Sequence, residues 1–474
     1  MTAVVLIVED DDDYITEILT ILEGIGAPYR AVVARSRDEA RVRLDSEFFD
    51  FAILDLKIPT GDSTLDLDPE HGKAIFHYAR RVTPGTKLLV LTSSPSDDFI
   101  ADLLTQKHDA DIWSEGSEVD TVEFLRKIDI DRAPNGIGKV LHAIRALDGV
   151  EIDLRSVNLD IGEDRLVRIF AKRFGAMRCV VSKIGSGRSG AKTLRLQLFD
   201  ASGAPFRKVV AKLASLDRVQ DEDRRYEAHI ILLDGAVTPR KMAMLEFGAG
   251  PIAGLFYQLA QGHDDSLFAT MAKEDARAAA AVAATAFALN DWSAGKPESR
   301  RTVKEVRQCW LADEKAVELQ ATYGLNWAAS FEARELQTRW CCVHGDLHGE
   351  NILVDDDNKI MIIDYGDVEH SAASYDAVSL ELSAVLQAND TISAAWPTEE
   401  LCRQWHDLDA YLGDCPIPEF VRACRLWALQ VAAGRREVAA CAYTYLLRQL
   451  KYSDTDKRRI LALLEGVRAY MNAT

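Results

Sequence analysis

Residues 340–367 place the strongest constraint on how this chain can fold. Two short apolar runs, Ile352–Val354 and Ile360–Ile363, flank a polar turn, and this pattern predicts a β-hairpin. Asn351 begins the first strand and Asp364 follows the second, so the hairpin would bring both side chains to the same end. Amide and carboxylate oxygens are ligands that Mg²⁺ prefers. The predicted hairpin is therefore also a candidate metal site.

Asp346 stands on the loop that leads into this hairpin, where its carboxylate could meet a hydroxyl group of a substrate. The spacing reads H-G-D-x-x-x-x-N, followed after the second strand by I-D-Y-G-D. This pattern resembles the catalytic core of the aminoglycoside phosphotransferase and choline kinase group, a branch of the protein-kinase-like superfamily. The resemblance implies an α+β bilobal fold and ATP- and Mg²⁺-dependent transfer of a phosphoryl group to a hydroxyl acceptor.

The same resemblance assigns roles to the polar residues. Asp346 would be the catalytic residue that orients or deprotonates the acceptor hydroxyl. Asn351 and Asp364 would bind Mg²⁺. Asp376 would be a structural aspartate that braces the catalytic loop, with a helix N-cap as the alternative. Gly345 stands where eukaryotic-type protein kinases carry Arg, which favours a small-molecule acceptor by resemblance and leaves a protein acceptor open.

A glycine-rich segment upstream lies between two predicted strands. Gly185, Gly187 and Gly190 give it the spacing G-x-G-x-x-G. In a dinucleotide-binding fold such glycines open a helix, whereas here a strand follows, as in the kinase arrangement. A glycine-rich hairpin without a ligand is the alternative. The predicted strands are Cys179–Ile184, Thr193–Phe199 and Val209–Leu213.

Lys212 lies in the third of these strands, where an unpaired lysine among apolar residues is costly. The following helix offers Glu227 as its partner, with Glu222 as the alternative. By resemblance, Lys212 and the three glycines would bind the phosphates of ATP, and Glu227 would align the lysine. Backbone groups near Leu259 and Gln261, at a predicted hinge, would hydrogen-bond the adenine.

Strands alternate with helices over the first part of the chain, which predicts a doubly wound parallel sheet in an α/β domain. Functional groups gather at the carboxyl ends of the strands in such sheets. Those ends carry Glu9, Asp10, Asp55 and Thr92, and a carboxylate cluster of this kind favours Mg²⁺. The predicted strands are Val4–Val8, Ala31–Ala34, Phe51–Leu54 and Lys87–Leu91.

The order V-E-D-D, I-L-D-L-K-I-P and L-V-L-T-S resembles the receiver domain of two-component response regulators. The resemblance implies a five-stranded, flavodoxin-like sheet. Asp55 would be the phosphoacceptor and, with Glu9 and Asp10, would bind Mg²⁺, while Thr92 would be the switch hydroxyl. It also implies a sensor histidine kinase as partner and a homodimer formed through the receiver.

One departure from the receiver pattern leaves the role of this domain open. The fifth strand is predicted to end within residues 110–116, where no lysine is present to pair with a phosphorylated Asp55. The alternative is a receiver fold kept for docking or dimerisation without phosphotransfer. For the whole chain, the alternatives to a small-molecule kinase are a receiver-gated protein kinase and a nucleotide-binding scaffold with little catalytic activity.

Composition excludes several classes of protein. The net charge of −19 argues against a nucleic-acid partner. The longest apolar run, Ala278–Leu289, is shorter than the roughly 20 residues of a membrane helix. Eight cysteines without metal-ligand spacing, and no predicted secretion signal, indicate the cytoplasm. The predicted domains are a receiver at 1–128, a helical linker at 129–174, a kinase-like N-lobe at 175–262 and a helical C-lobe at 263–474.

Overall fold

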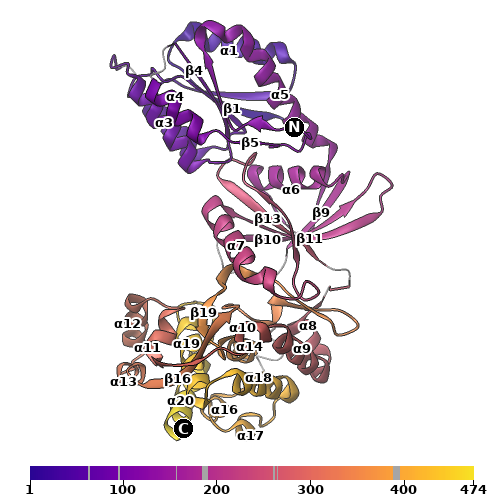
Figure 1. The fold of residues 1–474 in the computed structure, drawn as a ribbon, viewed down its shortest axis with the longest axis vertical. Helices are drawn as coiled ribbons and strands as arrows, with labels where there is room; N and C mark the ends of the chain where they lie inside the picture. The colour runs from indigo at the N-terminus through magenta and orange to yellow at the C-terminus, as the bar shows by residue number, and fades with distance from the viewer. Residues whose placement is uncertain are drawn as a thin grey trace. The chain divides into compact units, whose positions relative to one another are not determined.

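The computed structural model describes residues 1–61, 64–93, 97–155, 157–183, 191–259, 262–263, 265–387 and 396–474. The chain divides into two units (Figure 1). Unit 1 contains residues 1–223 and 241–259, and unit 2 contains residues 224–240 and 260–474.

Unit 1 begins with a five-stranded sheet in the order β2-β1-β3-β4-β7, in which every pairing is parallel. This is the doubly wound order of flavodoxin-like domains, as the sequence predicted. β1, β3 and β4 are buried along their whole length, as expected for strands covered by helices on both faces. The strands are β1 (Ala3–Val8), β2 (Tyr29–Ala34), β3 (Phe51–Leu54), β4 (Lys87–Thr92) and β7 (Val122–Arg126).

Alternate residues of β1 pack into two separate cores. Val5 and Ile7 pack in one core with residues of α1 and α5, whereas Leu6 and Val8 pack in the other with residues of α2, α3 and α4. The helices are α1 (Asp12–Ile25), α2 (Arg37–Ser46), α3 (Pro69–Val82), α4 (Asp97–Gln106) and α5 (Ala133–Ala146). A short antiparallel hairpin, β5 (Asp109–Ala110) and β6 (Val119–Asp120), is inserted between α4 and β7.

The second part of unit 1 is a six-stranded sheet in the order β12-β13-β11-β10-β9-β8. Helix α6 (Ile161–Arg173) packs on it, and Phe170 stacks on Phe256 with ring centroids 4.0 Å apart. Helix α7 (Leu216–His229) follows β11 directly. The strands are β8 (Glu151–Arg155), β9 (Arg178–Lys183), β10 (Lys192–Phe199), β11 (Pro205–Ser215), β12 (Arg240–Leu245) and β13 (Ile252–Leu259).

The segment 129–174 differs from the helical linker that we predicted. Its first helix, α5, packs on the receiver sheet, and its strand β8 extends the six-stranded sheet beside β9. Helix α6 covers that second sheet. We therefore propose that α5 completes the receiver-like domain, and that β8 and α6 belong to the N-lobe.

The two sheets of unit 1 share one hydrophobic core. It runs without interruption from β1 through α5 and α6 to β9, β10 and β11. A buried ion pair also joins the two parts, because Arg165 of α6 lies 2.7 Å from Asp50, just before β3. Backbone groups pair there as well, since Gly85 donates to Gly250 O and accepts from Gly248 N. The receiver-like domain is thus packed into the N-lobe.

Unit 2 is mostly helical and holds two small antiparallel sheets, β14-β17-β18 and β15-β16-β19. Its strands are β14 (Asp265–Ser266), β15 (Glu298–Thr302), β16 (Glu335–Val343), β17 (Ile352–Val354), β18 (Ile360–Ile362) and β19 (Glu369–Ala372). Its helices are α8 (Leu267–Lys273), α9 (Asp275–Ala288), α10 (Asn290–Ser293), α11 (Val303–Gln308), α12 (Asp313–Thr322), α13 (Ala328–Glu332), α14 (Tyr375–Leu386), α16 (Glu399–Arg403), α17 (Leu408–Tyr411), α18 (Pro418–Val431), α19 (Arg435–Gln449) and α20 (Lys457–Ala473).

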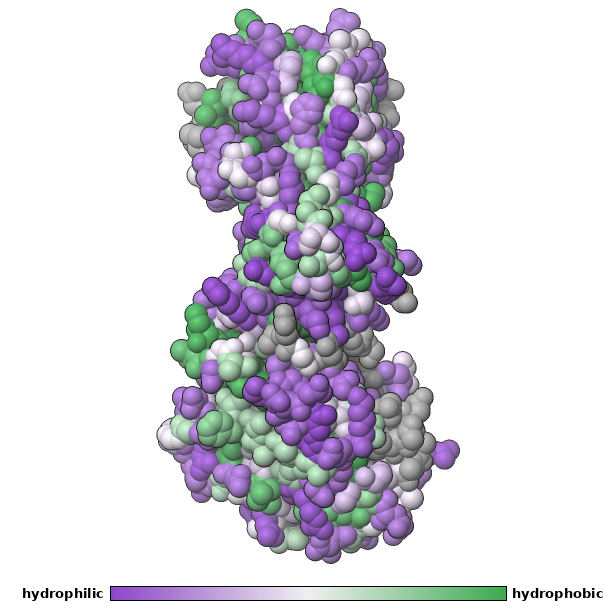
Figure 2. Space-filling view, turned by 90° about the vertical axis from the view of Figure 1, so that its right-hand side faces the viewer, coloured by the Kyte–Doolittle hydropathy of each residue, from purple (hydrophilic) through white to green (hydrophobic). Residues whose placement is uncertain are grey.

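The surface carries scattered apolar side chains. On the face drawn in Figure 2, hydrophilic residues alternate with smaller hydrophobic areas. Within the described ranges, none of the helices has the length and apolar character needed to cross a membrane.

Candidate functional site

The predicted hairpin of unit 2 is formed by β17 and β18, which pair with Ile352 opposite Ile362. Just beyond this pair, Ile363 N donates to Asn351 O at 2.9 Å. Asp364 follows immediately, and its backbone is left-handed at φ 68° and ψ 68°. A non-glycine residue rarely adopts this conformation without a functional reason. The hairpin therefore brings Asn351 and Asp364 to the same end, as the sequence predicted.

The Asn351 side chain is tied to the loop that carries Asp346. Its Nδ2 donates to Asp346 O at 2.9 Å, from a short 3₁₀ turn over Gly349–Asn351. Because the amide nitrogen is used in this way, the amide oxygen is the atom available to a metal ion. Together with the Asp364 carboxylate it forms a pair of hard oxygen donors. These residues fit a Mg²⁺ ion.

Asp376 of α14 holds the loop that carries Asp346 through two hydrogen bonds to its backbone. Its carboxylate accepts from His344 N at 2.7 Å and from Gly345 N at 3.0 Å. Burial raises the pKa of Asp376, against the opposing effect of His344 and the two backbone donors. The helix begins at Tyr375, so Asp376 lies inside its first turn and Ser374 occupies the N-cap position. The geometry is that of a brace for residues 344 and 345.

Two glycines of the loop are required by close packing. Gly345 has φ +81°, and a Cβ there would overlap Asp367 O and the ring of Trp310. A Cβ at Gly349 would overlap the ring of Phe268. The motif glycines therefore let the loop lie directly on its neighbours, and Trp310 occupies the space that a larger side chain at position 345 would need.

The Asp346 carboxylate is partly exposed, at 42% of its side-chain surface. Two basic groups stand near it: His348 Nε2 at 3.8 Å and Arg448 Nη1 at 3.9 Å. Burial lowers the pKa of His348. Arg448 was not predicted from the sequence, because a basic residue near the end of helix α19 carries no local sign of contact with this loop.

The ammonium group of Lys212 in unit 1 is paired with Glu222, with Nζ 2.8 Å from Oε2. Tyr257 donates its hydroxyl to the other carboxylate oxygen of Glu222 at 3.1 Å. Our prediction preferred Glu227, which is exposed. The reason for the error is the helix start: α7 begins at Leu216 with no loop after β11, which places the earlier glutamate beside the lysine.

The other predicted nucleotide-binding residues are only partly described. Leu259 ends β13, is buried, and pairs in register with Lys208 of β11. Gly185, Gly187, Gly190 and Gln261 lie outside the described residues.

The receiver-like domain carries the predicted carboxylate cluster at the ends of β1 and β3. Ligand atoms from Glu9, Asp10 and Asp55 lie within 4.8 Å of one another. Burial and the nearby Asp55 raise the pKa of Glu9 to about 7. Among the described residues no hydrogen-bond donor reaches the buried Asp55 Oδ1. A crowded carboxylate group with an unsatisfied oxygen fits a divalent cation.

The prediction that no lysine is available to pair with Asp55 is wrong. Lys127 directly follows β7, and its Nζ lies 2.7 Å from Asp55 Oδ2 and 2.6 Å from Glu9 Oε2. The error came from taking residues 110–116 as the end of the fifth strand. Ile112 and Trp113 are apolar because they join the core shared with α6, and strand β7 completes the sheet instead.

Thr92 ends β4 and is buried, as expected for a residue at this edge of the sheet.

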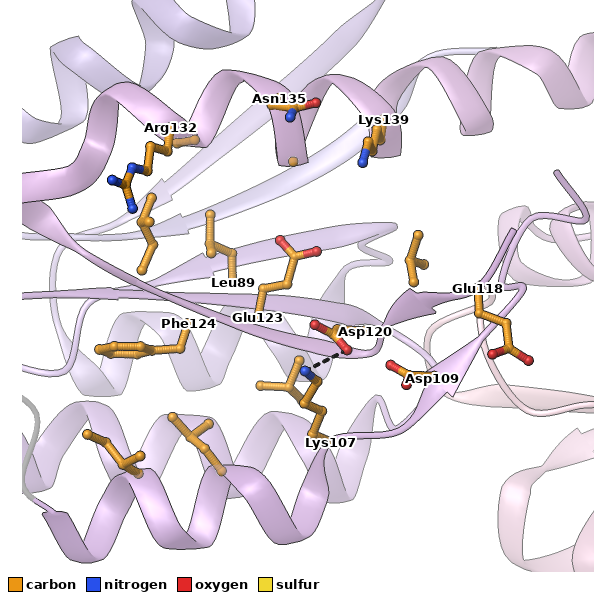
Figure 3. A pocket seen from close by; sticks show the side chains of 17 residues that line it. Leu89, Lys107, Asp109, Glu118, Asp120, Glu123, Phe124, Arg132, Asn135 and Lys139 are labelled. Atoms are coloured by element: carbon orange, nitrogen blue, oxygen red, sulfur yellow. Dashed lines mark ion pairs between the residues drawn. The ribbon is translucent and has the colours of Figure 1, made fainter. Parts of the chain in front are cut away.

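A separate cavity of about 780 Å³ lies between α4, β7 and α5 (Figure 3). Its labelled charged side chains include Asp120, Glu123 and Lys139. The described residues that line it include none of the carboxylate cluster.

A model of the phosphotransferase enzyme family matches residues 183–424, just over half of the 474 residues. Among solved structures, the chain is similar to an aminoglycoside-3'-phosphotransferase of type VIII, with 18% identity and a TM-score of 0.37, over 62% of this chain and 100% of that one.

The chain is also similar to a CheY-like response regulator receiver domain protein from Methanospirillum hungatei JF-1, with 22% identity and a TM-score of 0.22, over 30% of this chain and 98% of that one. None of the curated proteins compared with the chain matches it. The family model confirms the resemblance carried by the loop and hairpin of residues 340–367. The chain belongs to the phosphotransferase enzyme family.

Proposed function

We propose that this protein is an ATP- and Mg²⁺-dependent phosphotransferase that transfers the γ-phosphate to a hydroxyl group of a small molecule. The observation that carries the proposal is the arrangement of three residues in unit 2. Asn351 and Asp364 meet at one end of the hairpin, and the Asn351 amide is bonded to the backbone of Asp346. Phosphoryl transfer depends mainly on positioning and charge neutralisation, which such an arrangement supplies.

Each residue has a proposed task. Asp346 orients the acceptor hydroxyl and takes its proton as the new P–O bond forms and the bond to the β-phosphate oxygen breaks. Asn351 and Asp364 hold Mg²⁺, which neutralises phosphate charge when bound. In unit 1, Lys212 binds the α- and β-phosphates and Glu222 keeps it aligned. The backbone near Leu259 is proposed for adenine, together with the glycine-rich segment for the phosphates.

The packing around Gly345 supports a small acceptor. Protein kinases carry Arg at the corresponding position, as the resemblance implies. Here a side chain would overlap Trp310 and Asp367 O, so an arginine has no room. The loop is thus built to a different pattern from that of protein kinases.

We further propose that the receiver-like domain regulates this activity through phosphorylation of Asp55. Lys127 supports this proposal, because its ammonium group is placed to pair with a phosphorylated aspartate. The continuous core between the receiver sheet and the N-lobe gives a physical route for the effect. A sensor histidine kinase as phosphodonor and a second copy of the chain are the partners proposed by resemblance.

All eight cysteines are free thiols, which agrees with a reducing cytoplasm.

Incubation with ATP and Mg²⁺, followed by mass spectrometry, tests the proposed activity. The protein would be mixed with a metabolite fraction and, separately, with a protein fraction of cell extract. We expect a new phosphorylated small molecule with the wild type and none with Asp346→Asn, which keeps the side-chain shape. Phosphorylated protein alone would indicate a protein kinase. Nucleotide binding with identical products from both variants would contradict the proposal and indicate a scaffold.

A further inference from the structure

Arg448, near the end of α19, reaches the loop that carries Asp346. Its Nη1 donates to Gly345 O at 3.1 Å, and its Nη2 donates to Asp367 Oδ2 at 2.8 Å. Nη1 also lies 3.9 Å from Asp346 Oδ1. A guanidinium group has several donors in one rigid plane, so it can hold two acceptors at once.

The surroundings keep this guanidinium in place. The Arg448 side chain is only 12% exposed, and it lies over the ring of Trp310 at 5.9 Å. Trp310 is itself fixed, because it stacks on Tyr375 at 4.5 Å and donates its indole N–H to Ser371 Oγ at 3.1 Å. Ordering a long side chain costs entropy, and these contacts offset that cost in advance.

Gly345 is consequently held from two sides. Asp376 accepts its N–H, while Arg448 donates to its carbonyl oxygen. The peptide groups on either side of Gly345 therefore have fixed orientations, and Asp346 is the next residue. Through Asp367 the same guanidinium also holds the segment that follows Asp364.

We propose that Arg448 is a positioning residue for phosphoryl transfer. It holds the loop that carries Asp346 and the segment that follows Asp364 in fixed positions relative to each other. This inference rests on the proposed function, since it concerns the same site. Displacing a reacting group by about 1 Å can cost about a hundredfold in rate. A link between the catalytic loop and the metal-binding segment therefore acts on the rate more than on nucleotide binding.

The chain offers a matched control for a purely structural arginine. Arg425 of α18 forms a buried ion pair with Glu381 of α14, with Nη2 2.6 Å from Oε1. Its contacts are with Glu381 and Trp405, so it supports the helices of unit 2. Loss of this pair is expected to reduce the stability of the protein without changing the conformation of the loop that carries Asp346.

The test compares Arg448→Met, Arg448→Lys, Asp367→Asn and Arg425→Met. Two quantities are measured: hydrolysis of Mg·ATP with water as acceptor, and hydrogen exchange of the backbone amides of residues 344–351. In Arg448→Met we expect kcat to fall about 10- to 100-fold, with KM for ATP changed less than about threefold and with faster exchange of residues 344 and 345. Arg448→Lys should recover part of the rate, because its ammonium group keeps the positive charge but lacks the rigid planar fork of the guanidinium group.

Asp367→Asn provides a variant that is expected to fold, because its side chain is 45% exposed. Its effect should overlap with that of Arg448→Met, so the double variant should lose less than the product of the two single losses. The proposal is overturned if Arg448→Met and Asp367→Asn, like Arg425→Met, leave the kcat of the folded protein and the exchange of the loop unchanged. If the wild type neither hydrolyses ATP nor phosphorylates an acceptor, the proposed function fails, and the exchange measurement alone decides whether Arg448 positions the loop.

Discussion

The ammonium group of Lys127 lies 2.7 Å from Asp55 Oδ2, although the two residues are 72 positions apart in the sequence. The same ammonium lies 2.6 Å from Glu9 Oε2 and 4.1 Å from the ring centroid of Tyr14. Burial lowers the pKa of Lys127, but its bonds to Asp55 and Glu9 outweigh that effect and raise it. One buried cation thus holds together two carboxylates that would otherwise repel each other.

This cluster predicts a dependence of stability on pH in protein freed of divalent cations. The pKa of Glu9 is raised from 4.5 to about 7 in the folded state, so the folded state keeps its proton longer than the unfolded state does. The contribution of protonated Glu9 to the free energy of unfolding is therefore fully present below about pH 4.5. It is lost as the pH rises toward 7, by up to about 3 kcal/mol. Urea denaturation between pH 4.5 and 8 measures it.

Glu9→Gln is the matched variant for this measurement. It cannot ionise, so the difference in unfolding free energy between wild type and variant isolates the contribution of Glu9. Added Mg²⁺ should reduce the loss at high pH, because a cation stabilises the ionised cluster. A difference that does not change with pH would show that Glu9 is ionised throughout.

A second prediction separates the two candidate partners of Lys212. In Glu222→Gln the buried ammonium of Lys212 loses the negative charge of Glu222, so we expect the rate of ATP hydrolysis to fall at least about tenfold. Glu227→Gln, on the exposed side of the same helix, should stay close to wild type. Steady-state kinetics of both variants checks this. Equal losses would contradict the assignment of Glu222.

A third prediction concerns Gly345. Gly345→Ala should destabilise the protein and reduce activity, since the added Cβ would overlap Trp310 and the backbone of Asp367. Gly203→Ala is the control, because Gly203 also has a positive φ, of +80°, but has open space around it. It reports the conformational cost alone, about 1 kcal/mol. If the two alanine variants melt at the same temperature, packing around Gly345 is not what requires the glycine.

A fourth prediction follows from the shared core of unit 1. Arg165→Met removes the partner of the buried Asp50 and should cost about 3–5 kcal/mol of unfolding free energy. Because one core joins the receiver sheet to the N-lobe, hydrogen exchange should increase in both parts together. Arg30→Met, which removes an exposed pair with Glu47, should cost at most about 1 kcal/mol. Exchange confined to one part would show that the two parts unfold independently.

The sequence by itself determined the elements whose signals are local. The hairpin of residues 352–362 and the parallel strands of the N-terminal sheet follow from apolar runs and turn residues. Their geometry brings Asn351 close to Asp364 and brings Glu9, Asp10 and Asp55 to one edge, because strand ends have fixed positions in these motifs.

Only the tertiary structure decided which distant side chains complete these sites. The position of Lys127 beside Asp55 depends on which segment forms the fifth strand of the sheet. Ile112 and Trp113 misled the prediction because these apolar residues belong to a core shared with another sheet. The pairing of Glu222 with Lys212 depends on where α7 begins after β11. Arg448 meets Gly345 across 103 positions, through the packing of α19. Contacts of this kind arise from the summed packing of many residues, so no local pattern records them.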